Sequence, residues 1–164
     1  MTQISPYARH TSSPDSFWYM GALFTFLSTA EDTNGQFMLV EALGQPGGEP
    51  APHTHSLEDE AYYVLEGSLE FWVGDEHLMA PAGTYVYLPR NVRHSWKIHS
   101  VHARLLIMCW PAGLEGYFKE FAEPAKQLVL PPLPDPASID MERFIERGRA
   151  YGIEFHLPQY AGGS

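Results

Sequence analysis

The sequence has little cysteine, little positive charge and no long apolar run. Its single cysteine, Cys109, cannot form a disulfide within the chain. There are 10 lysine and arginine residues against 20 aspartate and glutamate residues, a formal net charge of -10. Since nucleic acids and anionic membranes are bound by clustered basic side chains, we expect neither as a partner. No apolar stretch approaches the roughly 20 residues that span a bilayer. The first residues show no apolar segment behind a basic start, so we expect a cytoplasmic protein.

The composition is that of a folded, turn-rich chain. At 164 residues it fits one domain. Apolar residues make up 45% and charged residues 18%, with 14 glycines and 14 prolines. This profile favours β structure.

Short strand candidates separated by turn residues dominate the first two thirds of the chain. The aromatic run at residues 17–27 predicts one bent strand or two, and Asp32, Asn34 and Gly35 predict a hairpin turn before a strand at 36–43. Further strands are expected at residues 61–66, 68–73, 84–88, 94–99 and 103–110. Many short strands with tight turns predict a sandwich or barrel.

The pattern becomes helical after Pro111. Leu114, Tyr117, Phe118 and Phe121 fall at helical spacing. A second helix is expected to begin after Asp135-Pro136 and to stop near Gly152. We therefore expect an N-terminal arm at residues 1–16, a β-barrel at 17–110, and at 111–164 an extension with one or two short helices packed on the barrel.

Two sets of residues at fixed spacing, here called frames, indicate a functional site. The first is Gly47, five residues, His53-x-His55, four residues, Glu60, six residues and Gly67. On an extended strand, residues i and i+2 point to the same face, so two imidazoles can meet one ion. From ordinary residue frequencies the whole frame arises by chance in roughly one chain in ten thousand. The second frame runs from Gly83 through Pro89-x-Asn91 to His94 and supplies a third imidazole.

These frames resemble the paired motifs of the cupin superfamily over residues 47–98. The resemblance implies an all-β jelly-roll barrel, with His53, His55, Glu60 and His94 at the metal-ligand positions. Glu58 and Asp59 compete with Glu60, but the gap after His55 selects Glu60, and we expect the other two in a solvated turn. Asn91 stands where the family often has glycine, and asparagine tolerates the left-handed backbone that glycine supplies.

Three neutral imidazoles and a carboxylate suit one divalent transition metal ion per chain, namely Fe, Mn, Ni, Co, Cu or Zn. Four ligands leave an open position on a six-coordinate ion, as a catalytic site requires. Glu60 is also the candidate general base. Tyr62 and Val64 share the strand parity of Glu60, and Trp96 and Ile98 share that of His94. We expect these four to line an apolar cavity that binds a planar organic substrate.

The single-barrel length and the C-terminal segment resemble those of single-domain bacterial cupins related to flavonol (quercetin) 2,3-dioxygenases. That resemblance implies a dioxygenase that cleaves a flavonol-like or other enolisable aromatic substrate with O2 and loss of carbon monoxide, with Glu60 accepting the substrate proton. Two alternatives stay open. One is a non-oxidative metal-dependent isomerase, cyclase or lyase, and the other is a non-catalytic binder of small molecules. The aromatic run at residues 17–26 also predicts a homodimer, because a partner or the barrel mouth must cover it.

Overall fold

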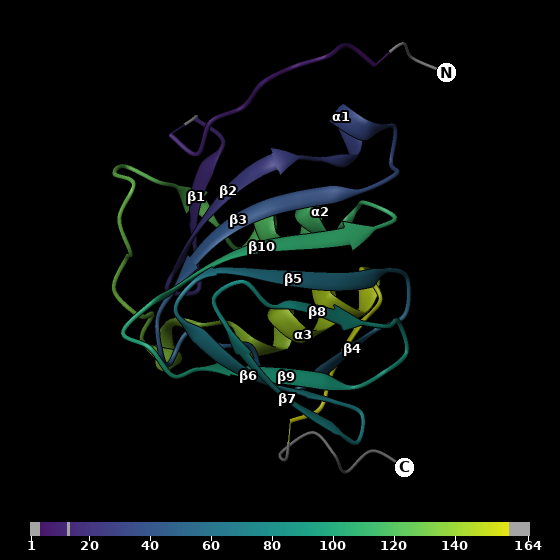
Figure 1. The fold of residues 1–164 in the computed structure, drawn as a ribbon, viewed down its shortest axis with the longest axis vertical. Coiled ribbons are helices and arrows are strands. Elements are labelled where there is room, and N and C mark those ends of the chain that lie inside the picture. Colours follow the sequence, from purple (N-terminus) through teal and green to yellow (C-terminus); the bar gives the residue numbers. More distant parts are fainter. Residues whose placement is uncertain (1–3, 13, 158–164) are drawn as a thin grey trace.

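Antiparallel strands form two sheets in the computed structural model, which describes residues 4–12 and 14–157 (Figure 1). In spatial order the larger sheet contains β11 (Glu123–Pro124), β1 (Ser16–Tyr19), β2 (Ala22–Ser28), β3 (Met38–Gly44), β10 (Ala103–Trp110), β5 (Asp59–Glu66) and β8 (Tyr85–Leu88). The smaller sheet contains β12 (Ile153–Phe155), β4 (His53–His55), β9 (His94–Ile98), β6 (Ser68–Val73) and β7 (Glu76–Pro81). The predicted all-β fold is confirmed.

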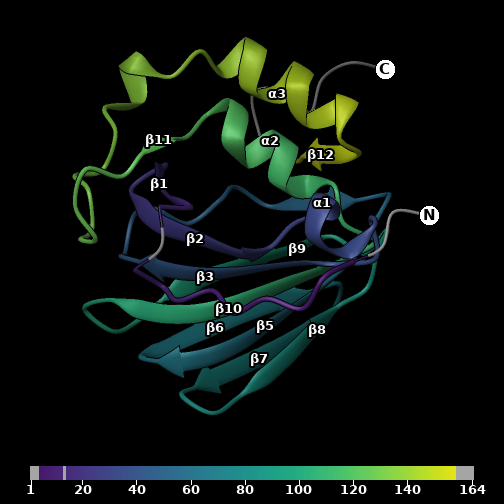
Figure 2. The same ribbon diagram turned by 90° about the horizontal axis from the view of Figure 1, so that it is seen from above.

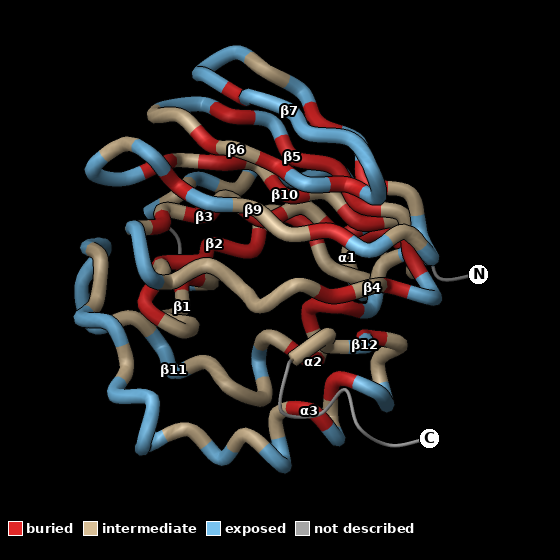
Figure 3. The backbone as a smooth tube through the Cα atoms, turned by 90° about the horizontal axis from the view of Figure 1, so that it is seen from below, coloured by how far each residue is buried: buried red, intermediate tan, exposed pale blue. Residues whose placement is uncertain are grey.

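The core lies between the sheets because the central strands alternate strictly. On β10 every second residue is buried, including Leu105 and Ile107. These residues pair in register with Ala42 and Val40 of β3, which are buried on the same face. The buried positions therefore lie on the faces where the two sheets meet. Figure 3 shows buried segments along the strands of both sheets and exposed segments in the outer loops.

The first aromatic run forms two strands. Met20 and Gly21, both at positive φ (45° and 85°), make the turn between β1 and β2. The predicted turn at residues 32–35 contains one turn of helix, α1 (Ala30–Thr33), which ends at Asn34 in the left-handed region. Asn91 also has a positive φ of 64°, as its place in the second frame predicts.

The C-terminal segment forms the two predicted helices, α2 (Leu114–Glu120) and α3 (Met141–Ala150), with a short 3₁₀ turn, η1 (Pro136–Ser138), between them. Figure 2 shows both helices on one side of the strands. Glu120 of α2 joins them through a 2.6 Å ion pair with Arg147 of α3. The chain then returns to the smaller sheet as β12, which pairs with β4. Within the described residues, no helix has both the length and the apolar character needed to cross a membrane.

The N-terminal residues that the structure describes lie along β2. Arg9 donates to the backbone oxygen of Leu27 at 3.1 Å and to Asp32 Oδ2 at 2.9 Å. Asp32 in turn accepts from the backbone of Thr29 and so caps α1. The partly buried, hydrogen-bonded carboxylate of Asp32 thus ties the arm to the start of the barrel.

Candidate metal centre

Four buried side chains from three strands meet between the sheets. His53 and His55 stand at alternate positions of β4, and His94 of β9 lies opposite His53 in the strand register. Glu60 comes from β5 in the larger sheet. Their ligand atoms all lie within 4.8 Å of one another, and each residue is at most 6% exposed. The structure therefore brings together the four residues that the two sequence frames predict.

Each histidine ring is oriented by a contact at Nδ1. His53 Nδ1 lies 2.8 Å from the backbone oxygen of Ala51, and His94 Nδ1 lies 3.1 Å from that of Val92. His55 Nδ1 lies 2.6 Å from a carboxylate oxygen of Glu58. The two backbone acceptors place the proton on Nδ1 of His53 and His94 and leave Nε2 of these rings with a free lone pair. All three rings thus present Nε2 to the centre of the cluster.

The two oxygens of Glu60 have different surroundings. Tyr62 donates its hydroxyl proton to Oε1 at 3.2 Å, and the thiol of Cys109 lies 4.0 Å from the same oxygen. Oε2 is buried and has no hydrogen-bond partner among the described residues. It lies 3.4 Å from His94 Nε2 and 3.7 Å from His55 Nε2. A buried carboxylate oxygen without a partner indicates a site for an ion or a ligand group.

The electrostatics favour the protonation states that a metal needs at His53 and Glu60, and the protonated ring at His55. Burial lowers the pKa of His53 to about 3, assisted by the positive potential of His94 and His55. Burial opposes ionisation of Glu60, but the 3.4 Å contact with His94 and the positive potential of the three histidines outweigh it and lower the pKa of Glu60 to about 2. Burial likewise lowers the pKa of His55, and the contact with Glu58 and the charge of Glu60 outweigh it, so the net shift is upward. At neutral pH, His53 is therefore a neutral donor and Glu60 an ionised one.

The donor spacing fits one transition metal ion. Metal–ligand distances of about 2.1 Å place neighbouring donors about 3.0–3.4 Å apart in octahedral or tetrahedral geometry. The two Nε2 atoms of His53 and His94 are 3.2 Å apart, and His94 Nε2 is 3.4 Å from Glu60 Oε2. Three imidazoles and one carboxylate are donors for a borderline divalent ion. The cluster thus suits a single metal ion of this class.

The prediction that Glu58 lies in a solvated turn is wrong. Glu58 is 5% exposed and its carboxylate contacts His55. The neighbouring Asp59 faces Arg90, with Asp59 Oδ2 at 2.9 Å from Nη2. The one sequence signal for Glu58 was its spacing of three residues from His55 across a turn, which is too common to single it out.

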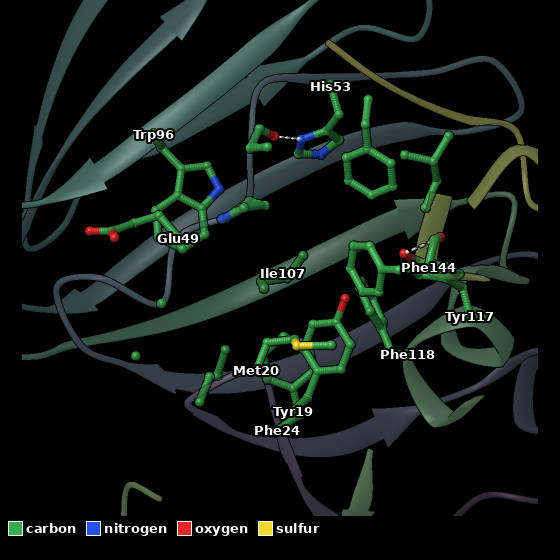
Figure 4. Close-up of a pocket in the computed structure, with 18 of the residues that line it drawn as sticks. Tyr19, Met20, Phe24, Glu49, His53, Trp96, Ile107, Tyr117, Phe118 and Phe144 are labelled. Atoms are coloured by element: carbon green, nitrogen blue, oxygen red, sulfur yellow. Dashed lines mark hydrogen bonds between the residues drawn. The ribbon is translucent and has the colours of Figure 1, made fainter. Parts of the chain in front are cut away.

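A cavity of about 270 Å³ opens beside this cluster. Its walls come from the inner faces of both sheets and from the C-terminal helices, and His53, His55 and Glu60 are among the lining residues. Figure 4 shows His53, Trp96 and the rings of Tyr19, Phe24 and Phe118 around the same space. The cavity is therefore apolar and aromatic, with the metal cluster as its main polar part.

Three of the four predicted substrate-binding residues line this cavity: Tyr62, Trp96 and Ile98. Val64 does not, because it is fully buried in the hydrophobic core. Sequence reasoning missed the contribution of the helical extension, from which Tyr117 and Phe144 reach the cavity.

Comparison with known proteins agrees with this site. A family model described as Cupin domain matches residues 41–109, a range that holds all four cluster residues. The quercetin 2,3-dioxygenase of Bacillus subtilis (strain 168) is 22% identical over 153 residues, which cover 93% of this chain and 45% of that protein. The quercetin 2,3-dioxygenase of Aspergillus japonicus is 27% identical over 128 residues, or 70% of this chain and 35% of that protein. The chain therefore spans less than half the length of these two relatives.

The solved structure of ectoine synthase from P. lautus has the same fold. It matches with a TM-score of 0.60 at 18% identity, over 82% of this chain and 100% of that one. Such low identity shows a shared fold and not a shared activity. Together with the two-sheet architecture, the family match shows a cupin domain at residues 41–109, in a chain that resembles the quercetin 2,3-dioxygenases.

Proposed function

We propose that this cupin is a metal-dependent dioxygenase that oxidatively cleaves a flavonol-like or other enolisable aromatic substrate. The observation that carries the proposal is a buried three-histidine, one-carboxylate cluster that opens on an aromatic cavity. The likeness to two quercetin 2,3-dioxygenases supports the choice of reaction and substrate class. His53, His55, Glu60 and His94 would hold one divalent transition metal ion.

The walls of the cavity recognise the substrate. Trp96 and Phe144 offer flat apolar faces to an aromatic ring, and Ile98 adds an aliphatic contact. At about 270 Å³ the cavity is slightly smaller than the roughly 300 Å³ at the lower end for drug-sized ligands, so it selects a compact, planar molecule. The helical extension adds a further apolar wall through Tyr117 and Phe144.

Glu60 is the proton acceptor in this proposal. When bound, the metal ion would supply the Lewis acidity that holds a substrate oxygen and O2 in one site. The proton of an enolic hydroxyl group passes to the carboxylate of Glu60, whose Oε2 has no hydrogen-bond partner in the described part of the chain. Tyr62 steadies the carboxylate through its hydrogen bond to Oε1. Because the pKa of Glu60 is lowered to about 2, the carboxylate is ionised at neutral pH but is a weak base, so the transfer requires a substrate hydroxyl group whose own pKa is lowered in the site.

Oxygen consumption by the metal-loaded protein tests the proposal. A panel of flavonols and other enolic aromatics is expected to contain at least one compound that the protein consumes together with O2. Glu60→Gln keeps one coordinating oxygen but cannot accept the proton, so turnover is expected to fall roughly 10²- to 10⁴-fold while most of the metal stays bound. Turnover that continues without O2 would instead identify an isomerase, cyclase or lyase, and binding without turnover would identify a non-catalytic cupin.

Three further predictions from the sequence remain part of this proposal. They are the division into an arm (1–16), a barrel (17–110) and an extension (111–164), the homodimer, and the cytoplasmic location.

A further inference from the structure

A second buried carboxylate lies at the metal centre behind one of the histidines. Glu58 Oε1 is 2.6 Å from His55 Nδ1, and the side chains of both residues are almost fully buried. The Nδ1 atoms of His53 and His94 contact neutral backbone oxygens instead. Of the three clustered histidines, His55 thus has its ring held by a charged group.

The turn that carries Glu58 is fixed from two sides by segments distant in sequence. Ser56 donates its backbone N–H to the backbone oxygen of Gly152 at 2.9 Å, just before β12. Arg90, in the loop between β8 and β9, donates to the backbone oxygen of Leu57 at 3.1 Å. These contacts set the path of the turn and direct the Glu58 carboxylate inwards.

The charge of Glu58 matters for a bound cation. A divalent ion held by three neutral imidazoles and Glu60 carries a net charge of about +1 in a buried site. The carboxylate of Glu58 brings the net charge of the ion and its surrounding groups to about zero, which reduces the free-energy cost of burying the ion. A carboxylate that accepts the Nδ1 proton also fixes the ring and strengthens Nε2 as a donor, an effect worth 10- to 100-fold in metal affinity.

We propose that Glu58 is a positioning residue of the metal centre, which holds His55 with its Nε2 towards the ion and balances the charge of a divalent cation. Glu58 acts through His55 and does not itself contact the ion. The inference rests on the metal centre of the proposed function and is independent of the oxidative chemistry assigned to it.

Titration of the metal-free protein with Co²⁺ and Zn²⁺ against a chromophoric chelator tests this role. Glu58→Leu removes both the acceptor and the charge, and the metal affinity is expected to fall roughly 100-fold. Glu58→Gln keeps a neutral acceptor, so a smaller loss of roughly 10-fold is expected. The visible absorption of the Co²⁺ form, which reports the donor strength of the ligands, is expected to shift in both variants.

Glu154→Gln is the matched control. Glu154 is exposed on β12 and lies opposite Thr54, between the two histidines of β4, so the change removes one nearby negative charge without touching the centre. Its metal affinity is expected to stay within about threefold of wild type, because an exposed charge is screened by solvent. Thermal melting of each metal-free variant separates a loss of affinity from a loss of folding.

Two results would overturn the proposal: a Glu58→Gln affinity within about threefold of wild type with an unchanged Co²⁺ spectrum, or a loss matched by Glu154→Gln. If Glu58→Leu does not fold, Glu58→Gln decides the question. A wild-type protein that binds Co²⁺ tightly but never consumes O2 would refute the proposed reaction and leave the role of Glu58 intact. Wild-type protein that binds neither ion would refute both.

Discussion

Gly152 couples the C-terminal extension to the metal centre, and Gly152→Ala is expected to weaken both folding and metal binding. Its φ of +77° is costly for a residue with a Cβ, by about 1–2 kcal/mol. An added Cβ would lie 2.7 Å from Ser56 Oγ and 2.6 Å from Leu57 Cγ. The exposed Leu57 side chain can rotate away at little cost, but Ser56 would lose its 3.1 Å hydrogen bond to the Gly152 oxygen, worth about 1 kcal/mol. We therefore expect a loss of about 2–3 kcal/mol in the free energy of unfolding.

Urea unfolding and metal titration of the same variants give the measurement. Gly83→Ala is the control, because Gly83 has a φ of +90° but no atom within 4 Å of the added Cβ. Its free energy of unfolding is expected to fall only by the cost of a positive φ in a residue with a Cβ, about 1–2 kcal/mol, and its metal affinity is expected to equal that of wild type. Gly152→Ala should also bind metal more weakly, because Ser56 directly follows the ligand His55. Equal stability losses in the two variants, with unchanged metal affinity in both, would refute this coupling.

Two further predictions concern the arm and the assembly. The hydrogen bond from Arg9 lowers the pKa of Asp32 to about 2 from an unfolded value of 3.8, so its stabilisation is complete above about pH 4 and is lost as the pH falls towards 2. In urea unfolding, Asp32→Asn should therefore lower the free energy of unfolding by about 1 kcal/mol at pH 7 and by almost nothing near pH 2. A loss of the same size at both pH values would contradict the assignment to the Arg9–Asp32 pair. Light scattering should give twice the mass of the 18.5 kDa chain at micromolar concentration, and the mass of one chain would remove the predicted dimer.

The metal cluster could be predicted from sequence because its geometry is mostly local. His53 and His55 lie on one short strand, so period-two alternation alone points both rings the same way. The same alternation placed Tyr62 correctly beside Glu60, but it did not place Val64 in the cavity wall. Four residues along a strand amount to roughly 13 Å, so Val64 shares the face of Glu60 but lies deep in the core.

Features that depend on distant contacts escaped prediction. Glu58 is buried because Arg90 and Gly152 fix its turn, and neither contact leaves a trace in the residues next to it. The edge strand β7 is exposed at nearly every position, so it lacks the alternation by which a half-buried strand is recognised. The helices α2 and α3 were predicted from their spacing, but the place of Tyr117 and Phe144 in the cavity wall depends on how the extension folds back.

Metal content tests the central claim most directly. Wild-type protein and a His53→Ala, His94→Ala double variant are purified in parallel, loaded with the same divalent ion, freed of excess metal and measured by elemental analysis. We predict about one ion per wild-type chain and almost none in the double variant, because the variant loses two of four donors that meet at one point. Equal metal in the two proteins would contradict the assignment of the site.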